Sequence, residues 1–158
     1  MDNLLKLLES NARMSAGDLA VALGQDEAAV AAQIEAYEKS GVILGYKALI
    51  NWEKTDRDLV NARIELKVTP KQTMGFEEIA EILAGFEEVE TVYLMSGSYD
   101  LALTISGRSF KEVAMFVATK LSPLESVQST ATSFILRKYK ERGLTINHHV
   151  DEREVTRL

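Results

Sequence analysis

The stretch VETVYLMSGSYDLALTIS, residues 89–106, contains two runs rich in β-branched and aromatic residues on either side of a short turn. Val89–Met95 and Tyr99–Ser106 predict strands, because residues of these types fit a pleated, half-buried surface. Ser96–Ser98, with its central glycine, predicts the turn between them. The stretch therefore predicts a β-hairpin.

The segments around this hairpin predict an α+β domain of ferredoxin-like topology. Upstream, residues 60–69 alternate between apolar and polar side chains, which predicts a strand with one solvated face. Apolar residues at helical spacing predict helices over 76–85 and 110–121, and Val127–Tyr139 predicts a fourth strand. The order is βαββαβ, in which right-handed crossovers place both helices on one face of an antiparallel sheet.

The second face of this sheet is left without a covering layer. Candidate apolar side chains on it are Met95, Phe134 and Leu136. An exposed apolar face is commonly covered by a second copy of the same chain. We therefore expect a homodimer formed through this domain.

Residues 1–50 predict three short helices separated by tight turns. Ser15 and Asp18 have the spacing of a capping box at the start of the second helix, and Gly24 is expected to end it. Asp26 is expected to cap the third helix, with Gly41 just beyond its end. The apolar stripe of the third helix consists of three residues: Val30, Ile34 and Tyr37.

A small hairpin is expected over residues 42–50, after the third helix. Three helices followed by a hairpin form the plan of a winged helix-turn-helix. The predicted domains are a winged helix-turn-helix over 1–50, a linker over 51–60, the ferredoxin-like domain over 61–142 and a C-terminal extension or tail over 143–158. Within that extension, residues 144–150 are expected to be able to add an edge strand.

Composition and charge narrow the classes of function. The net charge is −6, and residues 1–50 contain four Lys or Arg against seven Asp or Glu. An acidic chain is a poor non-specific binder of nucleic acid, because phosphate attraction supplies most of that affinity. There is no cysteine, and the apolar start of the chain is interrupted by Lys6 and Glu9, so we expect a cytoplasmic protein without a membrane span.

Catalytic and metal-binding motifs are not recognisable in the sequence. We find no nucleophile elbow, phosphate loop or zinc motif, and we expect neither an enzyme nor a cofactor. His148 and His149 are adjacent, and neighbours on a strand point to opposite faces, so they predict no chelating pair.

Two stretches together resemble the Lrp/AsnC family of bacterial and archaeal transcription regulators. One extends from Ser15-Ala16-Gly17-Asp18-Leu19-Ala20 to Gly41-Val42-Ile43-Leu44-Gly45-Tyr46; the other is Val92–Leu101, with the Gly-x-Tyr-Asp turn typical of the family. The resemblance covers roughly residues 1–142. It implies a homodimer that assembles further into tetramers or octamers, and a small effector, usually an amino acid, bound between dimers.

The resemblance also implies which residues bind this effector. They belong to the turn between the second and third strands and to the fourth strand of a neighbouring subunit: Ser96, Gly97, Ser98, Tyr99, Asp100, Thr130, Thr132 and Ser133. Backbone N–H groups of such a turn can hold a carboxylate. Asp100 offers a negative charge to an ammonium group, and the hydroxyls offer further hydrogen bonds. The alternative is that Gly97 only forms the hairpin and Asp100 only caps it.

The third helix is expected to enter the major groove of double-stranded DNA, together with the wing. The predicted contact residues are Glu27, Ala28, Ala29, Ala32, Gln33, Tyr46 and Lys47. This helix departs from the family pattern, because it is rich in alanine and glutamate and Lys39 is its only cation. Two functions therefore stay open: a DNA-binding regulator that responds to an effector, and an amino-acid-binding oligomer in which DNA binding is weakened or lost.

Overall fold

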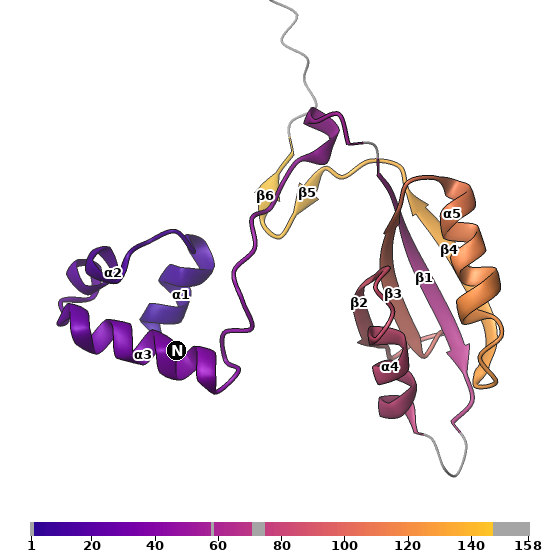
Figure 1. Cartoon of the computed structure of the whole chain (residues 1–158), viewed down its shortest axis with the longest axis horizontal. Helices are drawn as coiled ribbons and strands as arrows, with labels where there is room; N and C mark the ends of the chain where they lie inside the picture. The colour runs from indigo at the N-terminus through magenta and orange to yellow at the C-terminus, as the bar shows by residue number, and fades with distance from the viewer. Residues whose placement is uncertain (1, 58, 71–74, 147–158) are drawn as a thin grey trace, which may run out of the picture. The chain divides into compact units, whose positions relative to one another are not determined.

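The computed structural model describes residues 2–57, 59–70 and 75–146, and it divides into two compact units, residues 1–50 and 51–158 (Figure 1). The helices and strands, in chain order, are α1 (Asn3–Ser10), α2 (Ala16–Leu23), α3 (Glu27–Lys39), η1 (Trp52–Lys54), β1 (Val60–Val68), α4 (Phe76–Ala84), β2 (Val89–Leu94), β3 (Leu101–Gly107), α5 (Phe110–Phe116), η2 (Val117–Leu121), β4 (Val127–Ile135), β5 (Lys140–Glu141) and β6 (Leu144–Thr145).

Local signals set the helix ends of the first unit. Ser15 and Asp18 form the predicted capping box at the start of α2. Gly24 ends α2 at φ 64°, a left-handed conformation that favours glycine. The Asp26 carboxylate accepts a hydrogen bond from the Ala29 N–H at 3.2 Å, which confirms Asp26 as the cap of α3. The turn between α2 and α3 is therefore three residues long.

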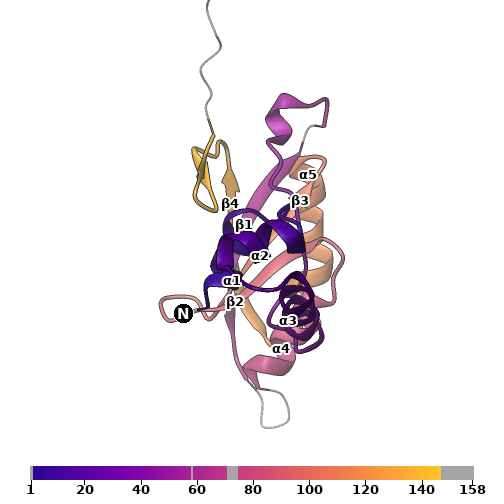
Figure 2. The ribbon, with the colours of Figure 1, turned by 90° about the vertical axis from the view of Figure 1, so that its left-hand side faces the viewer.

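The first unit has a small core of its own. Its buried residues come from all three helices: Leu4, Leu8, Leu19, Ala20 and Val30. Ile34 and Tyr37 pack against this core, which confirms the predicted stripe of α3. Figure 2 shows the three helices, α1, α2 and α3, in indigo to purple. The opposite side of α3 is solvent-exposed.

The hairpin predicted over residues 42–50 is wrong, since none of these residues lies in a strand. Leu44 is 95% exposed, and Leu49 and Ile50 are also exposed. An isolated two-stranded hairpin is only marginally stable, and these three apolar side chains do not belong to the core cluster of their unit. The segment is tied to α3 by two hydrogen bonds instead, from the Ile43 N–H to the Tyr37 carbonyl and from the Tyr46 hydroxyl to Glu38.

The second unit is built on a four-stranded antiparallel sheet in the order β2-β3-β1-β4. This order and the positions of α4 and α5 confirm the predicted βαββαβ topology. The core-facing side chains of β1 and β3 pack against Ile79 and Leu83 of α4 and against Val113 and Phe116 of α5. Both helices therefore cover the same face of the sheet (Figure 1).

Phe134 lies on the helix-covered face, which corrects its assignment to the open face. It is paired with buried Ala62 of β1, and its ring meets the Phe110 ring edge-on at a centroid distance of 4.7 Å. The opposite face of the sheet carries polar side chains on β1, because Arg63, Glu65 and Lys67 alternate with the core residues. Met95 and Leu136 are exposed, Leu136 to 85%.

Two strand boundaries differ by two residues or more from those predicted. The third strand begins at Leu101 rather than at Tyr99, because Tyr99 and Asp100 belong to the turn. The fourth strand ends at Ile135 rather than at Tyr139, since Ile135 is paired with Asn61 near the start of β1 and no partner strand continues beyond it.

The chain after β4 forms a separate two-stranded ribbon, β5–β6, with Arg142 and Gly143 at its tip. The edge strand anticipated over 144–150 is thus limited to Leu144–Thr145 in the described residues, and it pairs with β5 rather than with the main sheet. Residues 147–158, including both histidines, lie outside the described residues.

Candidate functional site

The candidate DNA-binding surface is the outward side of α3. Of the residues predicted to contact DNA, Glu27, Ala28, Ala29 and Ala32 are all exposed on it. Tyr46 and Lys47 are exposed in the segment that follows α3. The side chains that hold α3 in the core lie on its other side, and at the start of the helix Glu27 lies beside Gly17 of α2.

Gln33 is placed differently from the other candidates, because its side-chain amide is used inside the unit. Its Nε2 donates to the Tyr37 hydroxyl at 3.0 Å and to the Asp2 carboxylate at 3.3 Å. The Tyr37 hydroxyl donates to Asp2 as well. This bond is the main cause that lowers the pKa of Asp2 and raises the pKa of Tyr37. Reading a base with Gln33 would require breaking these bonds.

Asp2 supports the helix that carries the candidate DNA-binding residues, a role that the sequence did not reveal. Its carboxylate caps α1 through the Leu4 N–H at 2.8 Å and also receives the hydrogen bonds from α3. It therefore fixes α1 against the helix that carries the candidate DNA-binding residues. The capping role has a sequence signal, an aspartate before a helix, whereas the contact with Tyr37 joins residues 35 positions apart and has none.

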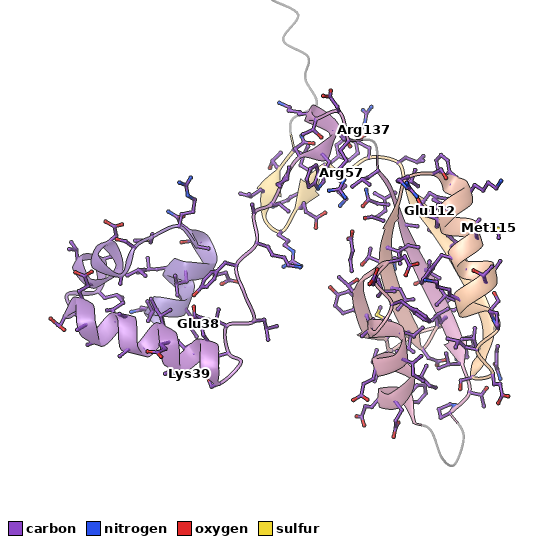
Figure 3. All side chains as sticks on the ribbon, in the orientation of Figure 1. Glu38, Lys39, Arg57, Glu112, Met115 and Arg137 are labelled. Carbon is purple, nitrogen blue, oxygen red and sulfur yellow. The ribbon has the colours of Figure 1, made fainter. Side chains whose placement is uncertain are left out.

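Acidic side chains limit the electrostatic potential of α3. Lys39, its only cation, forms an ion pair with Glu35 one turn earlier. Glu38 accepts a hydrogen bond from Tyr46 at 3.0 Å, and burial together with this bond raises the pKa of Tyr46. Figure 3 labels Glu38 and Lys39 at the C-terminal end of α3. Phosphate contacts from this helix are therefore few.

The candidate effector site is the turn between β2 and β3, which β1 holds in place. The Met95 N–H donates to the Asp100 carbonyl at 2.8 Å and closes the turn. The Asp100 N–H donates to the Leu66 carbonyl at 2.9 Å. The Asp100 carboxylate accepts the Val68 N–H at 2.9 Å through one oxygen and Lys67 Nζ at 2.9 Å through the other. The Val68 bond, followed by Lys67, lowers the pKa of Asp100.

The tip of this turn, by contrast, makes no such contacts. Ser96, Gly97 and Ser98 are all exposed. A Cβ atom built on Gly97 would have no heavy atom within 4 Å, and its φ lies outside the left-handed region. The fold therefore does not require glycine at this position, either for conformation or for space.

The candidate hydroxyls of β4 lie on both faces of the sheet. Thr130 and Thr132 are paired with Leu66 and Ile64 and share the helix-covered face, whereas Ser133 is paired with Arg63 and lies on the open face. In one chain, β1 separates these hydroxyls from the turn. The two groups of candidates thus do not meet in one pocket within a single chain.

Other features of the described residues fall outside both candidate surfaces. A hollow beside α5 is lined by Arg108, Ser109, Lys111, Glu112 and Met115, none of which was predicted to bind a ligand. Glu112 and Met115 mark it in Figure 3. Within the described ranges, no three His, Cys, Asp or Glu side chains gather as metal ligands would. No helix there has the length and apolar character needed to cross a bilayer.

Comparison with known proteins relates both units to one family. The Lrp/AsnC ligand-binding domain matches residues 61–145, and a winged helix-turn-helix DNA-binding domain matches residues 3–43. The HTH-type transcriptional regulator YugG of Bacillus subtilis is 44% identical over 153 residues, which are 96% of this chain and 92% of that protein. The leucine-responsive regulatory protein of Haemophilus influenzae is 27% identical over 143 residues, 90% of this chain and 86% of that protein.

Solved structures agree with the fold. A transcriptional regulator of Neisseria meningitidis in complex with L-Met has a TM-score of 0.71 at 20% identity, covering 93% of this chain and 96% of that one. The leucine response regulatory protein LrpA of Mycobacterium tuberculosis has a TM-score of 0.76 at 21% identity, covering 93% and 100%. By the match of its larger unit and by its likeness to YugG over almost its whole length, the chain belongs to the Lrp/AsnC family of transcription regulators.

Proposed function

We propose that this protein regulates transcription in the cytoplasm by binding double-stranded promoter DNA through α3, under the control of a small effector. The observation that carries the proposal is the outward side of α3, where Glu27, Ala28, Ala29 and Ala32 are exposed and lie outside the core of their unit. The second helix of a helix-turn-helix is the one that enters the major groove. Membership of a family of transcription regulators supports the same role. This role needs neither catalysis nor a cofactor.

We assign the effector to the class of amino acids. The leucine-responsive protein of H. influenzae and the L-Met complex of the N. meningitidis regulator support this class. The exposed tip Ser96–Ser98 offers backbone N–H groups to a carboxylate. Glycine at position 97, which the fold does not need, allows a ligand to approach the backbone closely.

The effector site is shared between subunits in this proposal. The turn and the β4 hydroxyls are separated by β1 in one chain, so Thr130, Thr132 or Ser133 can only complete the site from a second copy. Asp100 already binds Lys67 and Val68, and an α-ammonium group would replace the Lys67 ammonium there. The protein is then at least a homodimer, and assembly into a tetramer or octamer is compatible with the site.

A binding titration tests the DNA claim. Fluorescently labelled duplex from the region upstream of its own gene is titrated with the protein between about 50 and 200 mM salt, beside a duplex of mixed sequence. We expect salt-dependent binding with preference for the upstream duplex. No retention of either duplex at micromolar protein and low salt contradicts DNA binding.

The second candidate, an amino-acid-binding oligomer with weakened or lost DNA binding, is favoured by the charge of α3, where Lys39 is paired with Glu35. A thermal-shift screen against the twenty common amino acids, run beside the titration, separates the two candidates. A stabilising amino acid without DNA binding supports the second candidate, and DNA binding supports the first.

A further inference from the structure

The β5–β6 ribbon gathers positive charge in an acidic chain. Residues 137–142 contain four Lys or Arg against the single carboxylate of Glu141, although the whole chain has a net charge of −6. Arg137, Lys140 and Arg142 are exposed and have no ion pair in the described part of the chain. Lys138 is paired with Glu141 at 3.2 Å, which leaves three cations without an ion pair among the described residues.

The geometry of the ribbon presents these cations outward. Lys140 is paired with Thr145, so the two side chains lie on one face, while Glu141 and Leu144 share the other. The ribbon belongs to a sheet of its own and extends from the end of β4 (Figure 1). Figure 3 labels Arg137, which lies in the segment that leads into β5.

The tip of the ribbon has an unusual residue for its conformation. The two tip residues, Arg142 and Gly143, have φ values of 43° and 86°, as a two-residue hairpin turn of the tightest kind requires. Asparagine or aspartate followed by glycine is preferred in such turns, and arginine rarely adopts this conformation. An arginine kept in a strained position is a reason to look for a function of its side chain.

We infer that the β5–β6 ribbon binds the phosphate backbone of DNA through Arg137, Lys140 and Arg142. The inference rests on the proposed DNA-binding function. Lys and Arg side chains, with Thr hydroxyls, are the usual phosphate ligands, and Thr145 lies beside Lys140 on the same face. The recognition helix supplies few cations, since Lys39 is paired with Glu35, and the ribbon supplies the charge that α3 lacks.

A second copy of the chain is the alternative partner for this ribbon. Two exposed apolar side chains, Tyr139 and Leu144, lie next to the cations in the sequence. They do not form a continuous apolar patch on the face that carries Lys140. A stable protein interface is centred on apolar, charge-depleted area. Because exposed cations lie among these apolar side chains, the ribbon has no charge-depleted centre and fits DNA better than protein.

Paired double variants of the full-length protein test the inference. The ribbon variant combines Lys140→Ala with Arg142→Ala. Its control combines Arg108→Ala, just before α5, with Lys111→Ala on α5, and removes the same number of cations. A mixed-sequence duplex and the upstream duplex are both titrated over a range of salt. Each lost phosphate contact lowers the slope of log affinity against log salt by about 0.9, and therefore weakens binding about tenfold at 0.1 M salt.

For the ribbon variant we expect a slope lower by about two and equal weakening on both duplexes, with the control close to wild type. A third variant, Arg142→Gly, removes the strain together with the charge. It should melt at the same temperature or higher, and still lose about tenfold in affinity. Its unchanged fold excludes misfolding as the cause.

Three results overturn the inference. If the wild type binds DNA and the ribbon variant keeps its slope, the ribbon does not contact phosphate, while the proposed function stands. If the ribbon variant instead loses self-association by sedimentation, the ribbon contacts a second copy. If the wild type binds neither duplex at low salt, the proposed function and the inference both fail.

Discussion

The carboxylate of Asp100, in the turn just before β3, accepts a hydrogen bond at 2.9 Å from the backbone N–H of Val68, at the end of the neighbouring strand β1. With Lys67 Nζ at 2.9 Å from its other oxygen, Asp100 anchors the candidate effector turn to the end of β1. The turn is therefore held at its base while its tip, Ser96–Ser98, stays exposed. In the proposed function, a ligand would bind this exposed tip while the base of the turn keeps its bonds to β1.

The anchor predicts a pH dependence of stability. The Val68 bond and Lys67 hold the pKa of Asp100 below its ordinary value, so the folded state binds fewer protons here than the unfolded state. The stabilisation is present above the ordinary pKa of aspartate, about 3.9, and is lost as pH falls through the lowered value. In urea titrations at several pH values, wild type should lose more stability on acidification than Asp100→Asn. Parallel curves for the two proteins would contradict this.

The pKa values of Asp2 and Asp18 are also lowered, mainly through hydrogen bonds with Tyr37 and Ser15 respectively. These two carboxylates therefore also contribute to the pH dependence of stability. Both carboxylates are present in wild type and in Asp100→Asn, so the difference between the two curves isolates Asp100. Removal of Lys67 by Lys67→Met provides a second check. It should reproduce part of the effect, because the Val68 bond remains.

Gly97→Ala is expected to separate ligand binding from folding. Position 97 has open space and no left-handed φ, so the melting temperature should not fall. The stabilisation by the best amino acid in a thermal-shift assay should shrink, because a methyl group obstructs approach to the turn. The matched control is Gly24→Ala, also in open space but at φ 64°, which should destabilise by about 1 kcal/mol. A loss of stability in Gly97→Ala equal to that of the control would show a purely structural glycine.

Local sequence signals predicted most of this fold, because their causes are local. The capping box of Ser15 and Asp18 and the left-handed Gly24 depend only on neighbouring residues. The alternation in β1 likewise identified the buried face of that strand. Family membership then followed from the order of the two units together with the turn at Gly97.

Features set by pairing across the chain were predicted less well. Phe134 was assigned to the wrong face because its side follows from the register that pairs it with Ala62. The 42–50 hairpin was predicted from composition, which does not say whether a packing surface exists. Gln33 was predicted to face DNA, but its side chain instead donates to Tyr37 and to Asp2. Asp2 is 31 residues away in the sequence, so no local pattern indicates this contact.

Glu35→Gln on α3 should strengthen DNA binding. The substitution removes a negative charge from the outward side and frees Lys39 from its ion pair, which allows about one more phosphate contact. The slope of log affinity against log salt should then steepen by about 0.9. Glu81→Gln, on α4 of the other unit, makes the same change in net charge and should leave affinity unaltered. Equal strengthening by both variants would indicate a general charge effect rather than contact by α3.

Truncation of a buried leucine and of an exposed leucine of the second unit should have different consequences. Leu103 is 1% exposed in the core, and Leu103→Ala should lower the free energy of unfolding of the protein by about 2–5 kcal/mol. Leu136 is 85% exposed in one chain, and Leu136→Ala should change the free energy by less than about 0.5 kcal/mol. If Leu136 instead packs against a second copy, as the proposed dimer allows, Leu136→Ala should weaken self-association in sedimentation equilibrium. A monomeric wild type in the same experiment would contradict the dimer.

The most direct test of regulation is the affinity of the protein for its upstream DNA with and without the amino acid that stabilises it most. Binding at two linked sites is reciprocal, so the amino acid and the DNA must change each other's affinity by the same factor. We predict a factor of about 5 to 150 in either direction, reached only at a higher amino-acid concentration in Gly97→Ala. Unchanged DNA affinity at saturating amino acid, for every amino acid that binds, would contradict an effector-controlled regulator.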